Sequence, residues 1–169
     1  QSVSQWASAL AESGLGVSKT LGDLMGPMFF ACTMGIARVF YGKFGAKISL
    51  SKFMAASSAL CVVAYAVTVL SPYPLLSLGG CALCGLAVGI MWPGTFSMAS
   101  AAIPLGGTSM FAMLALAGDT GCTSGPSLAG KIADTFGSDI KYGFAFAAVF
   151  PVVMLILSLV RVRKENKIK

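Results

Sequence analysis

The chain has 169 residues, of which 56% are hydrophobic and only 11% are charged. Soluble globular domains carry about 25% charged residues, so a water-facing surface cannot be built over most of this chain. The net charge of +6 comes from bases that gather around Lys43 and at the C-terminal end, not from a broad basic face, which argues against a nucleic-acid binder.

The middle of the chain is almost free of charge. From Phe53 to Gly130 the one residue with a formal charge is Asp119, where a soluble stretch would carry on the order of twenty. The apolar runs are about twenty residues or longer, whereas the strands of membrane barrels alternate over about ten residues. Since every backbone group in lipid must bond within its own segment, the runs are predicted to be membrane helices. The expected fold is therefore all-α, a polytopic transmembrane helix bundle with about five spans.

The helix-compatible residues 1–11 are expected to be the end of an earlier helix, because Gly14 and Gly16 interrupt the pattern after them. Pro93 should kink or break the third of the spans that follow. The expected spans cover roughly residues 20–42, 52–70, 75–101, 108–129 and 142–160.

Basic residues near the ends of the spans indicate the orientation in the membrane. Lys43, Lys47 and Lys52 mark the first loop as cytoplasmic, and the basic C-terminal tail lies on the same side after five spans. The expected organisation is a transmembrane half-bundle over residues 1–162 and a cytoplasmic tail over residues 163–169, in the cell membrane. Because the chain starts at Gln1 without a leader pattern, it is expected to be a piece of a longer protein.

Asp119 lies near the middle of the fourth expected span, where a carboxylate costs about 2.5–3.5 kcal/mol. Such a residue usually faces a water-filled cavity or a polar partner. It borders a stripe of small residues that includes Gly118 and Cys122, so it is expected to point toward protein and not toward lipid. Two interpretations stay open: a substrate, proton or conformational site, and a structural acid bonded across helices.

Two tryptophans are candidates to line a solute cavity. Trp92 lies beside Pro93 within a span, although lipid-facing Trp prefers the membrane interfaces. Its ring could stack on a solute or pack in the core. Gln5 and Trp6 lie near the outer end of the truncated first helix, where they could line an outward vestibule.

Pairs of small residues four apart recur along the spans. Gly121 and Gly125 are followed by Pro126, and Gly85 and Gly89 form a second pair in the third span. Such pairs let helices approach closely, and a neighbouring proline favours a kink. They are therefore interpreted either as packing surfaces or as hinges of a moving protein.

The enzyme hypothesis has little support. The chain has no histidine, no Ser/His/Asp set, no phosphate-binding loop with its lysine and no acidic pair. Cys81 and Cys84 form an isolated CxxC inside a span, which favours packing over metal or redox chemistry. We therefore expect a protein that is not an enzyme and has no cofactor and no metal.

At this point the chain resembles a known family. Its four or five helices, with a basic cytoplasmic loop and a span broken by Pro and Gly, look like the C-terminal half of a major facilitator superfamily transporter. The stretch from Gly89 to Pro126, GIMWPGTFSMASAAIPLGGTSMFAMLALAGDTGCTSGP, looks like bacterial members near the fucose-permease and sugar-symporter branch. The resemblance covers the whole chain. It implies that residues 1–11 end the seventh helix and that the five spans are helices eight to twelve of a twelve-helix fold.

A weaker form of the signature loop of this family follows the first span. Gly35, Gly42 and Lys43 occupy matching places, which implies a conformational role. The acid expected in the motif is replaced by Val39, with Arg38 beside it. The resemblance therefore does not carry the cytoplasmic charge latch over to this half.

The resemblance implies a secondary active transporter in which two six-helix halves rock around a central site. Gln5, Trp6, Trp92 and Asp119 are then expected to line the cavity from this side, with Pro93 among the hinge residues. The expected partners are the lipid bilayer, a small organic solute and the absent N-terminal half. A finer expectation is that the solute is a sugar and that protons are transported with it. The alternatives are an efflux member of the same superfamily and a structural membrane subunit.

Overall fold

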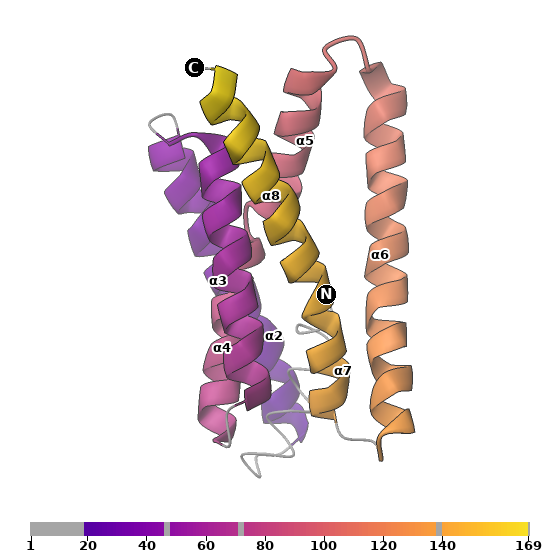
Figure 1. Ribbon diagram of the computed structural model, residues 1–169. Coiled ribbons are helices and arrows are strands. Elements are labelled where there is room, and N and C mark those ends of the chain that lie inside the picture. The colour runs from indigo at the N-terminus through magenta and orange to yellow at the C-terminus, as the bar shows by residue number, and fades with distance from the viewer. Residues whose placement is uncertain (1–18, 46–47, 71–72, 138–139, 169) are drawn as a thin grey trace.

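The computed structural model describes residues 19–45, 48–70, 73–137 and 140–168, and within these ranges all regular structure is helical (Figure 1). The helices are α2 (Lys19–Phe44), α3 (Leu50–Leu70), α4 (Pro74–Val88), α5 (Met91–Ala102), α6 (Gly107–Thr135), α7 (Ile140–Ala147) and α8 (Val149–Ile168). The all-α prediction is confirmed. Residues 1–18, which hold the expected end of an earlier helix, lie outside the described residues.

Three of the expected spans are both long and apolar enough to cross a membrane. They correspond to Leu50–Leu70, Gly79–Ala102 and Ala145–Lys167 among the residues described. The other two expected spans form α2 and α6, which have 26 and 29 residues and so measure about 39 and 44 Å. Their length suffices to cross a bilayer, although neither is among the three helices of the described residues that combine this length with a sufficiently apolar composition.

Two spans are broken in the same way. Pro93 follows an interruption at Gly89 and Ile90, and Pro151 follows an interruption at Ala148, the residue between α7 and α8. A proline has no N–H to donate to the carbonyl four residues earlier, and its ring collides with that carbonyl. The expected break at Pro93 is confirmed, and the second break was not expected. By contrast, α6 continues through Pro126 without an interruption.

The core of the bundle is built on α3 and α4. α3 packs against α4 and α8, and α2 packs against α4. Small side chains meet at the α3–α4 contact, where the Sγ atoms of Cys61 and Cys84 are 3.8 Å apart and Ala64, Tyr65 and Cys81 are buried beside them. In Figure 1, α6 stands apart from this group, and its main contact is with α7.

The backbone of α4 is in direct contact with α2. A Cβ atom added at Gly85 would collide with the carbonyl oxygen of Phe30 and the hydroxyl of Thr33, and one at Gly89 would lie 2.7 Å from the Cβ of Ala37. The Thr33 hydroxyl donates to the carbonyl oxygen of Ala82 at 2.7 Å. The Gly85–Gly89 pair is therefore a packing surface, as one of its two interpretations predicted.

The two basic segments lie at the same end of the bundle. Ser51, in the first turn of α3, donates to the carboxylate of Glu165 in α8 at 2.6 Å, and Arg161 lies 3.8 Å from the same carboxylate. The C-terminal basic residues are thus beside the loop between α2 and α3. Helix α8 runs to Ile168, so residues 163–168 of the expected tail continue this helix.

The α2–α4 contact can be tested with one alanine. Gly85→Ala should lower the free energy of unfolding in detergent by about 1–3 kcal/mol, because the new methyl group overlaps backbone atoms of α2 that cannot move aside. Gly79→Ala is the matched control, since nothing lies within 4 Å of a Cβ at that position of the same helix. Equal stabilities for the two variants would contradict this packing.

Candidate functional site

A cavity of about 580 Å³ opens between α2, the broken α4–α5 span and α6. Its size falls within the range of about 300–1,000 Å³ that is usual for small-molecule sites. Most of its lining is apolar, with one cation and one anion. The lining residues are Phe30, Met34, Arg38, Val88, Met91, Trp92, Thr95, Gly118, Asp119, Cys122 and Met154.

Trp92 begins a row of aromatic rings between α5 and α6. Its ring lies 4.8 Å from that of Phe96 in an edge-on contact, and Phe96 stacks on Phe111 of α6 at 5.6 Å. The indole also lies directly against Gly118, where a Cβ atom would have no room. Trp92 nevertheless stays 47% exposed, so part of the ring is available to the contents of the cavity.

Asp119 lines the same cavity from α6. No side chain of the described residues lies within salt-bridge or hydrogen-bond distance of its carboxylate. Thr123 and Ser127 follow it at intervals of four, and their hydroxyls donate to carbonyls of the same helix, at 3.1 Å to Asp119 and 2.8 Å to Thr123. This exposed face of α6 is polar, but its hydroxyls are satisfied within the helix. The Asp119 carboxylate remains available to a ligand or to water.

Arg38 is a cavity residue that the sequence reasoning missed. Its Nε atom donates to the carbonyl oxygen of Gly89 at 3.1 Å. In an unbroken helix, the N–H of residue 93 would donate to the Gly89 carbonyl, but Pro93 has no N–H. Arg38 of α2 therefore replaces the missing donor. The sequence does contain a signal for this role, because Arg38 is the one arginine within its span and a neighbouring span contains a proline.

The remaining predicted residues are spread over several places. Gln5 and Trp6 lie outside the described residues. Gly35, Gly42 and Lys43 are exposed on the second half of α2, and a Cβ atom at either glycine would have no neighbour within 4 Å. Pro93 is exposed in the first turn of α5, Gly121 is exposed on α6, and Gly125 and Pro126 are buried on α6. The cavity thus joins Trp92 and Asp119 and includes none of the hinge candidates.

No group of three or more potential metal ligands occurs in the part of the chain that the structure describes. The CxxC pair is buried at the α3–α4 contact, away from the cavity. What the cavity offers chemically is therefore an aromatic face, one carboxylate, one guanidinium and the Thr95 hydroxyl, which suits recognition of a small solute.

A helical bundle with apolar spans around a partly polar cavity defines a polytopic membrane protein. The chain matches the Major Facilitator Superfamily over residues 4–169, and it belongs to this superfamily of membrane transporters. Comparison with curated proteins and with solved structures gave no significant match. The predicted resemblance is confirmed at the level of the superfamily, and the fucose-permease branch stays a prediction.

The bond between Arg38 and Gly89 predicts a coupling between two substitutions. Arg38→Met should lower the free energy of unfolding by about 1–2 kcal/mol, because the Gly89 carbonyl then has no donor in an apolar setting. In a Pro93→Ala background the same change should cost less, since an alanine in place of the proline can supply the N–H.

The measurement is a double-mutant cycle of unfolding in detergent, with Arg163→Met, at an exposed position near the C-terminus, as the control for loss of a positive charge. Arg38→Met could lower the free energy of unfolding equally in the unaltered protein and in the Pro93→Ala background. That result would show that the hydrogen bond does not replace the helical donor.

Proposed function

We propose that this chain is the C-terminal half of a secondary active transporter that moves a small organic solute across the cell membrane by alternating access. The half that completes the site belongs to the same protein and precedes this segment. In this proposal the solute binds in the cavity between α2, α5 and α6, and Asp119 and Trp92 contact it. Gln5 and Trp6 would extend the lining toward the outer side.

The observation that carries the proposal is the convergence of Trp92, Asp119 and Arg38 on one cavity, from three different segments. An indole ring and a carboxylate are costly to leave facing lipid, and polar groups within a membrane bundle usually mark a solute or ion path. Binding between the halves, next to a broken helix, is also the general arrangement of secondary transporters.

We propose a sugar or a similar polyhydroxylated compound as the solute. The apolar face of a sugar ring can pack on the exposed part of Trp92, and its hydroxyls can donate to the Asp119 carboxylate. The Arg38 guanidinium adds donors from α2. The Thr95 hydroxyl donates to the Met91 carbonyl oxygen at 2.7 Å, and its oxygen can accept a hydrogen bond from the solute. This combination of one aromatic face and a few polar groups supports orientation as well as binding.

We also propose that the C-terminal end and the loop between α2 and α3 are cytoplasmic. Both carry clusters of Lys and Arg, and the bond from Ser51 to Glu165 holds them side by side. Residues 1–162 then form the membrane half-bundle, and residues 163–169 are the basic cytoplasmic end. Gly35, Gly42 and Lys43, with Pro93, Gly121, Gly125 and Pro126, are the proposed sites of conformational change.

Asp119 is the proposed proton site. In the protein with both halves, reconstituted into vesicles, Asp119→Asn should reduce proton-driven accumulation of solute at least tenfold and remove its pH dependence. The physical reason is that an amide resembles the protonated acid but cannot release the proton. Solute exchange without a gradient should persist.

Asp134→Asn is the matched control, because this exposed acid lies on the same helix but does not line the cavity. Unchanged pH dependence and uptake in Asp119→Asn would rule out a proton role for Asp119.

A counterflow assay with a panel of labelled sugars tests the solute and the direction. Accumulation of one sugar in preloaded vesicles supports a sugar transporter and favours import. Extrusion of dyes without sugar counterflow would identify an efflux transporter. Cysteine substitutions at 92 and 119 that never react with aqueous reagents would overturn the cavity itself and favour a structural subunit.

A further inference from the structure

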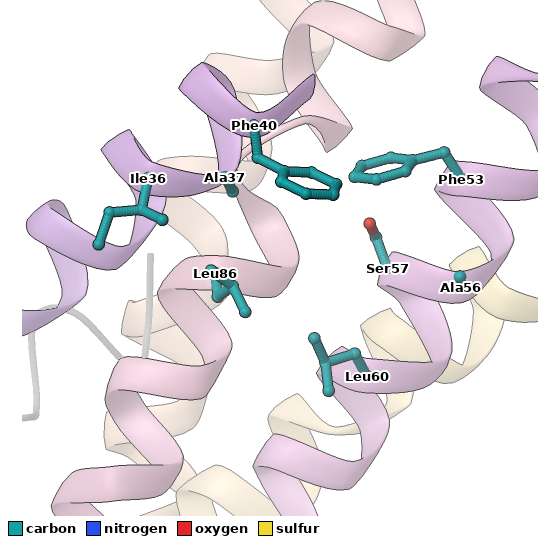
Figure 2. A pocket seen from close by; sticks show the side chains of 8 residues that line it. All are labelled: Ile36, Ala37, Phe40, Phe53, Ala56, Ser57, Leu60 and Leu86. Atoms are coloured by element: carbon teal, nitrogen blue, oxygen red, sulfur yellow. The ribbon is translucent and has the colours of Figure 1, made fainter. Parts of the chain in front are cut away.

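A second hollow, of about 350 Å³, lies between α2 and α3, away from the solute cavity. Figure 2 shows that Phe40 of α2 and Phe53 of α3 point toward each other at one end, and that Leu60 of α3 and Leu86 of α4 line the other end. We call this hollow the α2–α3 groove. From Phe53 to Leu60 it follows α3 for about 10 Å.

The α2–α3 groove is apolar and open to the side. Ile36 and Phe40, which line it from α2, are 60% and 49% exposed. No described helix covers these two side chains. In a chain that crosses a membrane, an open apolar surface of this kind faces acyl chains. Apolarity alone does not say which lipid would occupy it.

The charges at one end of the groove do select a lipid. Lys43 follows Phe40 by three positions and Ile36 by seven, so it continues the same face of α2. Lys52 precedes Ala56 of the groove by four positions and so lies on the same face of α3. Both lysines are exposed, one in the last turn of α2 and the other in the first turn of α3.

These two lysines have no nearby acid in sequence. Residues 24–118 contain neither Asp nor Glu. Among the residues that the structure describes, the acid at this end is Glu165, which is bound to Ser51 and Arg161. The contact recorded for Lys43 is with the ring of Phe44, 5.8 Å from Nζ to the centroid. An uncompensated pair of ammonium groups at the mouth of an apolar groove fits an anionic head group with an acyl chain.

We propose that the α2–α3 groove binds one acyl chain of an anionic phospholipid whose phosphate contacts Lys43 and Lys52. Ile36, Phe40, Phe53 and Leu60 hold the chain, and the lysines select a head group with net negative charge. The α2–α3 groove shares no lining residue with the solute cavity, so lipid retention can be measured without knowing the solute.

The test is native mass spectrometry of the purified protein with both halves, in detergent with phosphatidylglycerol or with phosphatidylcholine of the same acyl chains. Phosphatidylglycerol should be retained at least tenfold better. Lys43→Gln with Lys52→Gln should remove this preference. Lys131→Gln with Lys164→Gln is the control, since it makes the same change of charge at exposed positions outside the groove.

A second pair of variants tests the groove without touching the lysines. Ala56→Phe should fill the groove and reduce retention of phosphatidylglycerol, while Ala66→Phe, at an exposed position of α3 outside the groove, should not. Glycerol phosphate, which has the anionic group but no acyl chain, should not compete.

Four results would overturn the proposal. The first is equal retention of both lipids by the unaltered protein. The second is retention that is unaffected by the lysine pair or by Ala56→Phe, and the third is full competition by glycerol phosphate. Protection of Ala56→Cys from a maleimide in lipid-free micelles would also overturn it, because another protein segment would then fill the groove.

Discussion

The contact of α2 with the backbone of α4 is the interaction on which the solute cavity depends. Glycines at 85 and 89 remove the side chains that would hold the two helices apart, and Thr33 and Arg38 then reach backbone carbonyls of α4 and of the break that follows it. In lipid a carbonyl without a donor is expensive, and water is not present to replace the donor. At the break before Pro93, a neighbouring helix supplies the donor that the proline lacks, and this hydrogen bond stabilises the break.

This arrangement connects the break to the cavity. Arg38 bonds to the Gly89 carbonyl with one of its nitrogen atoms and lines the same space as Asp119 and Trp92. The residue that stabilises the interruption is thus also part of the lining of the cavity.

Helix α6 shows how a polar segment is accommodated in such a protein. Its exposed hydroxyls donate to carbonyls of the same helix, for example Ser124 to Thr120 at 2.6 Å, so they add polarity without adding unsatisfied groups. Contact with α7 and the aromatic row from Trp92 to Phe111 hold α6 at the edge of the cavity. A half-bundle built this way presents one polar helix beside an otherwise apolar core, which suits a surface that faces a solute path.

The low charge and the long apolar runs determined the membrane class and the helical fold, and the place of Pro93 within a run determined that a break occurs near it, because these features depend on the chemistry of single segments. The sequence also singled out Trp92 and Asp119, since an indole and a carboxylate are unusual within an apolar span. Only the tertiary structure decided that these two residues share a cavity with Arg38, whose partner Gly89 is 51 positions away. The rotation of each helix and its distance from its neighbour decide which side chains meet between helices. Small residues set this distance, and they do so through contacts between segments that are far apart in the sequence.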